Sequence, residues 1–205
     1  MTPAASTKRG RPLGSSPSGR ERLLRAARTE FGDRGYGATT VDHLVAAAQV
    51  NPPTLYHHFG NKSGLFVAAA RHAYDEVLAA FRAKLPRPAS IAFDVSVATV
   101  LDVSIDVMRR NPDLAKLFLV IQFELPRQPG LKEELHTMLR EFRGFFEEIA
   151  ATAPSHLAAN DSERRELAHA LIAIVNGLNG EALLLRRPAD YPKLVERMGA
   201  LIQRD

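Results

Sequence analysis

Apolar residues recur every three or four positions along most of this 205-residue chain. That spacing places them on one side of an α-helix. Residues 20–35 give an example, with Leu23, Leu24, Ala27 and Phe31 on one stripe. No stretch alternates between apolar and polar residues between hairpin turns, which is the pattern of a half-buried strand. The sequence therefore predicts an all-α protein of about nine helices.

Glycine, proline and capping residues divide this pattern into segments. No internal repeat is visible. The helices expected from these signals cover residues 20–35, 39–48, 52–59, 62–85, 89–110, 112–125, 130–153, 161–187 and 191–202. The first three are short and closely connected, which is the layout of a helix-turn-helix head that binds DNA. The longer helices that follow predict a C-terminal helical bundle body.

The positive charge of the chain lies in this N-terminal part. The formal net charge is +4. Residues 1–66 carry nine Lys and Arg against four Asp and Glu, whereas the remaining 139 residues carry eighteen against nineteen. A basic head on a neutral body suits a protein that binds nucleic acid through its first third.

Composition excludes several classes of function. The chain has no cysteine, so it has no disulfide framework and no thiolate metal site or nucleophile. It has neither an apolar run long enough to span a membrane nor the apolar core of a secretory signal in its basic first residues, so we expect a cytoplasmic protein. His72 and Glu76 have metal-like spacing but no visible third ligand, and we expect no metal and no cofactor.

The stretch QVNPPTLYHHFGNK, residues 49–62, places two prolines before a short helix. The first turn of a helix has N–H groups without intrahelical partners, so the missing donors of Pro52 and Pro53 cost little there. Asn51 is suited to cap this helix, and it takes the extended conformation favoured before proline. Pro53 disfavours a helical Pro52, so the helix is expected to begin at Pro52 or one residue later.

Residues 22–66 closely resemble the N-terminal domain of the TetR family of transcriptional regulators. The resemblance rests on F-x-x-x-G-Y-x-x-T-T-V from Phe31 to Val41 and on T-L-Y-x-H-F-x-x-K-x-x-L from Thr54 to Leu65. The family more often has Gly at position 49, Ser at 51 and Gly at 53, so its base preference is not carried over. The resemblance implies a dimeric regulator, usually a repressor, whose body binds a small molecule.

This interpretation divides the chain into three parts. Residues 1–18 form a disordered basic arm, 19–66 the helix-turn-helix DNA-binding domain, and 67–205 the ligand-binding and dimerisation domain. Base or phosphate contacts are expected from exposed residues of the third helix and from the starts of the second and fourth. Those residues are Thr40, Pro52, Pro53, Thr54, Tyr56, His57 and Lys62.

A second candidate for DNA contact is KRGRP, residues 8–12, which resembles the core of an AT-hook. Arg9 and Arg11 flank Gly10, which would permit close approach to the floor of the minor groove. The alternative is an unstructured basic tail that helps solubility. The sequence leaves both open.

The body offers candidates for a homodimer interface and for a ligand pocket. We predict a homodimer interface on the helix over 161–187 and on the last helix. The helix over 161–187 has glycines and two apolar stripes, and at least one of these stripes must belong to the core of the chain itself. The candidates for the interface are Leu171, Ile174, Gly177, Leu178, Gly180, Leu194, Met198 and Leu201. Phenylalanines with sparse polar groups predict a mostly apolar pocket, with Phe118, Gln122, Phe145, Phe146, Asn176 and Asn179 as candidates.

The sequence therefore favours a repressor that occupies a pseudo-palindromic operator in double-stranded DNA until an apolar ligand releases it. One alternative is an enzyme with its active site in the helical body, but no nucleophile–base motif or phosphate loop supports it. Another is a regulator with a vestigial pocket whose output is set by a protein partner.

Overall fold

The computed structural model describes residues 17–184, 190, 193 and 196–197. Over these residues the predicted all-α fold is confirmed. One 3-10 turn, η1 (Pro88–Ser90), precedes α5. The α-helices are α1 (Gly19–Ala38), α2 (Val41–Ala48), α3 (Pro52–Phe59), α4 (Lys62–Lys84), α5 (Phe93–Arg110), α6 (Pro112–Glu124), α7 (Pro129–Glu134), α8 (His136–Ala150) and α9 (Asp161–Leu184).

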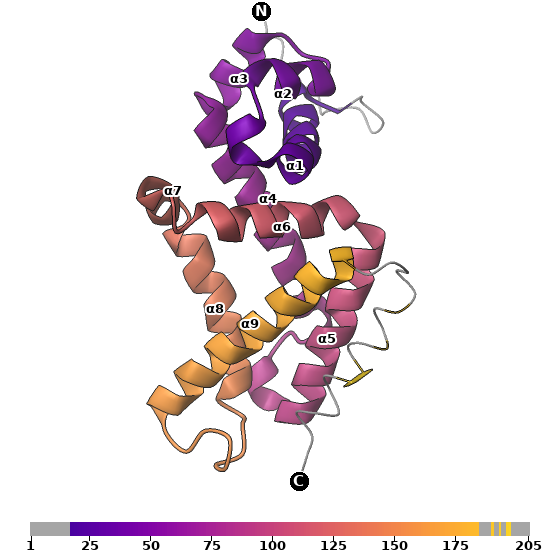
Figure 1. Cartoon of the computed structure of the whole chain (residues 1–205). Coiled ribbons are helices and arrows are strands. Elements are labelled where there is room, and N and C mark those ends of the chain that lie inside the picture. The colour runs from indigo at the N-terminus through magenta and orange to yellow at the C-terminus, as the bar shows by residue number, and fades with distance from the viewer. Residues whose placement is uncertain (1–16, 185–189, 191–192, 194–195, 198–205) are drawn as a thin grey trace, which may run out of the picture.

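The helices form a small head and a larger body that share one long helix (Figure 1). α1, α2 and α3 lie together at one end, α5 to α9 form the other, and α4 runs from the first into the second. The domain boundary expected after residue 66 therefore falls within α4, and no loop separates the two parts there. The last helix expected, over 191–202, lies largely outside the described residues.

The head helices begin where polar residues cap them. Ser18 and Glu21 form a reciprocal capping box at the start of α1, and Asn61 Oδ1 accepts the N–H of Gly64 at 2.8 Å at the start of α4. Such caps satisfy N–H groups that have no partner within the helix. The predicted end of the first helix at Gly35 marks a kink, where φ is 76°, and helical backbone resumes as far as Ala38.

Two boundaries in the body differ from the prediction. The helix expected over 130–153 is split into α7 and α8 at Leu135, whose ψ of −2° interrupts the regular backbone. Leu135 is fully buried, so the apolar stripe continues across the break and conceals it in the sequence. The helix expected from about residue 89 begins at Phe93, because η1 occupies the preceding residues.

Each part has its own aromatic core. In the head, Phe31, Tyr36 and Phe66 meet with ring centroids 4.9–5.9 Å apart. In the body, the rings of α4 and α8 interleave around Phe81, which lies 5.4 Å from Phe145 and 6.0 Å from Phe146. These contacts bring α8 against α4 and so position the helices that surround the cavity described below.

The head rests on the body where α1 packs along α6. Thr29 Oγ1 donates to Asp113 Oδ2 at 2.9 Å, and Lys116 Nζ donates to Asp33 Oδ1 at 2.6 Å. The hydrogen bond to Asp33 raises the pKa of Lys116. Gly32 lets the helices approach closely, since a Cβ there would lie 3.1 Å from Lys116 Cβ. The head is thus held on α6 by directional polar contacts.

Candidate DNA-binding surface and ligand cavity

α3 begins at Pro52, the earlier of the two starts that the sequence allows, and both prolines lie in its first turn. Asn51 is extended and accepts the N–H of Thr54 at 3.3 Å, as its role of cap requires. Leu55 is fully buried and holds α3 on the head. The two missing proline donors therefore fall where a helix has no internal use for them.

The opposite side of α3 is open to solvent. Pro52, Pro53 and His57 are exposed, and Tyr56 is 52% exposed despite its large ring. Thr54 is only half-buried, but its hydroxyl donates to Asn51 Oδ1, so it offers an acceptor rather than a donor to other groups. Exposed proline and tyrosine surface is of the kind that contacts thymine methyls and phosphates in a major groove.

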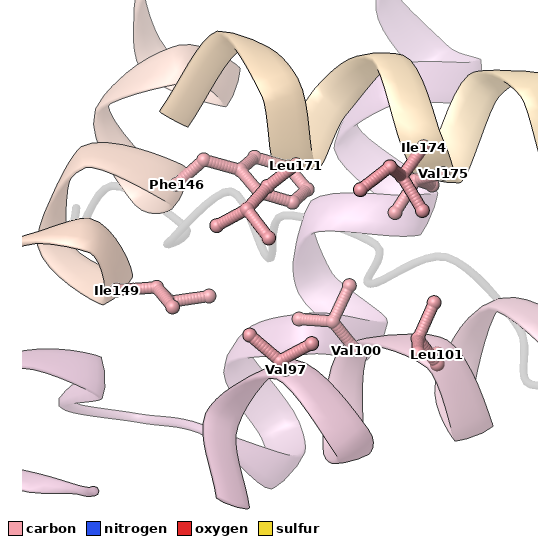
Figure 2. A pocket seen from close by; sticks show the side chains of 8 residues that line it. All are labelled: Val97, Val100, Leu101, Phe146, Ile149, Leu171, Ile174 and Val175. Atoms are coloured by element: carbon pink, nitrogen blue, oxygen red, sulfur yellow. The ribbon is translucent and has the colours of Figure 1, made fainter. Parts of the chain in front are cut away.

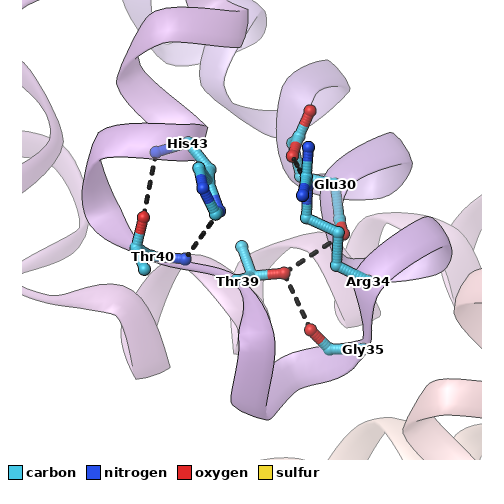
Figure 3. A network of polar contacts seen from close by, with 6 residues as sticks. All are labelled: Glu30, Arg34, Gly35, Thr39, Thr40 and His43. Carbon is cyan, nitrogen blue, oxygen red and sulfur yellow. Dashed lines mark hydrogen bonds and ion pairs between the residues drawn. The ribbon is translucent and has the colours of Figure 1, made fainter.

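The start of α2 presents a second exposed polar group (Figure 3). Thr40 Oγ1 accepts the N–H of His43 at 3.2 Å, while His43 Nδ1 accepts the N–H of Thr40 at 3.4 Å. An accepting ring nitrogen carries no proton, so the neutral His43 ring holds its proton on Nε2. The exposed Thr40 hydroxyl keeps its proton for an outside acceptor. The sequence analysis did not predict that the ring of His43 takes part in this cap.

The turn between α1 and α2 is closed by side chains of the head itself. Thr39 is fully buried, and its hydroxyl reaches Gly35 O at 2.7 Å and Glu30 O at 3.1 Å (Figure 3). Lys62 Nζ donates to Tyr36 O at 3.0 Å and Thr39 O at 2.9 Å. The ammonium expected to contact phosphate therefore binds backbone carbonyls of the α1–α2 turn. Arg9 and Arg11 lie outside the described residues.

An apolar cavity lies in the body among α5, α8 and α9 (Figure 2). It encloses about 270 Å³, part of it open to solvent. Every lining side chain is aliphatic except one phenylalanine. The lining consists of Val97, Val100, Leu101, Phe146, Ile149, Leu171, Ile174 and Val175.

Of the six residues predicted for a pocket, only Phe146 lines this cavity. Phe118 and Phe145 are buried elsewhere, Phe118 against Tyr74 and Phe145 against Phe81. Gln122, Asn176 and Asn179 are not among the lining residues, so the expected polar handles are missing from this space. The valines of α5 were missed because a short aliphatic stripe signals core and cavity wall alike.

The residues predicted for the dimer interface lie in different surroundings within a single chain. Leu171 and Leu178 are 6% and 5% exposed within a single chain, because α9 turns this stripe toward its own core, and Ile174 lines the cavity. Gly180 faces α6, where a Cβ would lie 3.4 Å from Leu119, whereas Gly177 is exposed with nothing nearby. Leu194, Met198 and Leu201 lie outside the described residues.

The His72–Glu76 pair noted in the sequence belongs to an ionic cluster. Arg28 donates to the Glu76 carboxylate and lies 3.4 Å from His72 Nδ1, and Asn111 Nδ2 donates to Glu76 at 3.3 Å. Within the described residues, no group of three or more His, Asp or Glu side chains could hold a metal ion. In the same part of the chain, no helix is long and apolar enough to cross a membrane.

A three-helix head with an exposed third helix, joined by a shared helix to an all-helical body, defines a helix-turn-helix transcriptional regulator. Residues 23–69 match the family model described as "Bacterial regulatory proteins, tetR family". Residues 23–69 are thus a DNA-binding head of the TetR type, and the resemblance seen in residues 22–66 is confirmed.

Named relatives support this assignment. The HTH-type transcriptional activator FasR of Mycolicibacterium smegmatis is 36% identical over 83 residues, which cover 40% of this chain and 37% of that protein. This chain therefore spans little more than a third of FasR in that match. The HTH-type transcriptional regulator BetI of Burkholderia thailandensis is 26% identical over 179 residues, covering 87% of this chain and 88% of BetI.

A solved structure agrees with the fold along nearly the whole chain. It is a transcriptional regulator from Saccharomonospora viridis in complex with choline, with a TM-score of 0.71 and 17% identity. The alignment covers 91% of this chain and 96% of that one. At this identity the likeness establishes the architecture of head and body.

Proposed function

We propose that this protein is a homodimeric, cytoplasmic repressor that occupies a pseudo-palindromic operator and leaves it when an apolar ligand enters the body. It is not an enzyme. The observation that carries the DNA-binding part is the exposed face of α3, with Pro52, Pro53, Tyr56 and His57 free of contacts that would bury them. Thr40 and Thr54 add polar contacts on either side, and the basic arm with Arg9 and Arg11 follows the minor groove.

The dimer follows from the geometry of operators. A single head of this size reads one half-site, and two heads must be held about 34–36 Å apart to read two successive major grooves. The exposed part of α9 around Gly177, together with the residues that follow α9, supplies the surface for the second copy. Leu171 and Leu178 stay in the core of each chain.

The ligand is neutral and apolar. The cavity wall carries no charged or polar side chain among its eight residues and a single aromatic ring. A quaternary ammonium such as the choline of the Saccharomonospora viridis protein is recognised by several aromatic faces, which this wall lacks. The enclosed free space is far below the about 300–1,000 Å³ that is usual for ligand sites, so binding must widen the cavity.

Widening the cavity couples ligand binding to the position of the head through contacts between helices. The cavity lies against α9, and α9 touches α6 where Gly180 meets Leu119. α6 in turn holds α1 through Asp113 and Lys116. A ligand that displaces α9 therefore bears on the helix on which the head rests. Affinity for operator falls only if the ligand binds the displaced form more tightly.

The first experiment selects operator DNA from a random duplex pool with the full-length protein. Replacing each thymine of the selected half-site by uracil removes one methyl and leaves every hydrogen-bonding edge intact. Positions opposite Pro52 and Pro53 should lose about 0.5–1.5 kcal/mol of binding free energy. If no inverted repeat is selected, the operator model is wrong. If no thymine responds, the prolines serve only to start α3.

The second experiment measures melting temperature and operator affinity with neutral straight-chain alkanols of increasing length and with choline. Apolar chains should raise the melting temperature and weaken operator binding, and choline should do neither. A response to choline alone would contradict the proposed ligand class. Absence of any small-molecule response, with release by a co-purifying protein, would favour the regulator with a vestigial pocket.

A further inference from the structure

The C-terminal end of α1 leaves carbonyl groups without partners in the helix, as every helix does. Here they are satisfied from two places. The single hydroxyl proton of Thr39 is shared between Gly35 O, at the end of α1, and Glu30 O, further back in the helix. The ammonium of Lys62, from the first turn of α4, donates to Tyr36 O and to the C-cap carbonyl of Thr39. A cation at this position also complements the negative end of the α1 dipole.

The Lys62 ammonium has little capacity left for another partner. Two of its three N–H groups are used by carbonyls at 2.9 and 3.0 Å, and its charge lies 4.4 Å from the centre of the Tyr36 ring. That ring is itself fixed by Phe31 and Phe66. The side chain is half-buried. Only the third N–H group is left for a phosphate, because the other two are held by the carbonyls of Tyr36 and Thr39.

The start of α4 is also fixed to α3. A Cβ on Gly64 would lie 2.1 Å from Phe59 O, so only glycine permits this approach of the last residue of α3 to the first turn of α4. Lys62 stands two residues away on the same turn. The first turn of α4 is therefore the point to which both α3 and the α1–α2 turn are attached.

We propose that Lys62 is a positioning residue that clamps the α1–α2 turn to the start of α4, and does not bind phosphate. The clamp sets Thr40 and the N-terminus of α2 at a fixed distance from α3, so that both can meet the same stretch of DNA. This inference rests on the proposed DNA-binding function, and it replaces the phosphate contact expected for Lys62 from the sequence.

The two roles predict different salt dependence. A lost phosphate contact lowers the slope of log affinity against log salt by roughly one, because one fewer counterion is released. A lost clamp weakens binding by the same factor at every salt concentration. It also destabilises the head without DNA, since hydrogen bonds from a charged donor are removed from a half-buried site.

The test uses full-length Lys62→Met, which keeps the length of the side chain but removes its charge and donors. Lys84→Met, an exposed lysine at the other end of α4, is the matched control. Lys62→Met should melt roughly 4–8 °C below wild type without DNA. Its operator affinity should fall about tenfold with an unchanged salt slope, and Lys84→Met should change neither quantity.

A salt slope lowered by about one, whatever the melting temperature, would overturn the clamp. So would a Lys62→Met melting temperature within about 1 °C of wild type. If Lys62→Met gives no cooperative transition, Lys62→Gln, which keeps a shorter neutral donor, is judged by the same two criteria. The melting measurement contains no DNA, so failure of wild type to select an operator would refute the proposed function and leave the clamp to be judged separately.

Discussion

The head and the body use different means to hold their helices together. In the head, short helices are fixed by directional contacts: the Thr40–His43 box, Asn51 on α3, Lys62 on the α1–α2 turn, and Gly64 against a backbone carbonyl. In the body, α4, α5, α8 and α9 meet mainly through aromatic and aliphatic side chains, and the cavity wall contains no polar group. The ion pair between Arg82 and Glu148 adds one directional contact between α4 and α8.

This difference suits different tasks. Hydrogen bonds and close backbone contacts allow one geometry, which a surface that reads DNA must keep. Apolar contacts are non-directional, and an apolar core tolerates repacking with smaller losses than a broken polar network. In the proposed function, the apolar body is the part that changes shape around a ligand, and the head moves as a unit.

The largest expected effect is loss of the body core through Phe81→Ala. This fully buried ring contacts three other phenylalanines, so its removal should destabilise the protein by about 3–5 kcal/mol in denaturant unfolding. Phe123→Ala is the control, because that ring is 59% exposed, and it should cost less than about 1 kcal/mol. Equal losses would refute the assignment of Phe81 to the core.

The second largest effect is expected in the head, from Gly64→Ala. Its Cβ would overlap Phe59 O, and a backbone atom cannot move aside cheaply, so we expect a destabilisation of about 2–3 kcal/mol and loss of operator binding. Gly144→Ala in α8 meets nothing within 4 Å and should stabilise by about 0.5–1 kcal/mol. Retained operator binding in Gly64→Ala would show that α3 and α4 are not rigidly joined.

High pH should weaken the body through Tyr74. Burial raises the pKa of its hydroxyl from 10.0 to about 12. The unfolded chain therefore loses this proton first, and stability present below pH 10 falls as the pH rises toward 12, by at most about 2–3 kcal/mol. The decrease in the free energy of unfolding between pH 10 and pH 12 should be absent in Tyr74→Phe. An identical pH profile for the variant and wild type would remove Tyr74 as the cause.

The smallest expected effect tests the connection between α2 and α3. Gln49 has φ 53° and ψ 48°, a left-handed conformation that costs a residue with a side chain about 1–2 kcal/mol. Gln49→Gly removes that cost but loses more chain entropy on folding, so a net gain of roughly 0.5 kcal/mol is expected. Gln49→Ala keeps the strain and should be near neutral. Thermal unfolding of the pair decides the sign.

Local signals explain which parts of the fold the sequence could predict. The caps Thr40, Asn51 and Asn61 act within three residues of themselves, so local signals predicted the helix starts in the head to within two residues. The TetR family more often has glycine at position 49, and that preference fits the left-handed conformation found at Gln49. The exposed face of α3 followed from the same local pattern.

Contacts between distant segments could not be predicted in this way. Helical periodicity gives α9 two apolar stripes but does not say which one meets its own chain, and Leu171 and Leu178, which were predicted for a dimer interface, are buried within the single chain. The expected pocket placed polar groups beside phenylalanines, whereas the cavity found is bounded by valines of α5 that no motif marks. Lys62 reaches carbonyls 23 and 26 residues earlier in the chain, a pairing that only folding creates.

The length of α4 determines how far the head moves when the helix tilts in the body. Its 23 residues extend over about 35 Å, with the Gly64 turn at one end and the aromatic core near the other. A tilt of about 5° at the core end sweeps the opposite end through roughly 3 Å. Against a major groove about 12 Å wide, that displacement is enough to withdraw side chains from base edges. In the proposed function α4 is a lever. The displacement of the head per degree of tilt depends on the length and stiffness of this helix, whichever ligand causes the tilt.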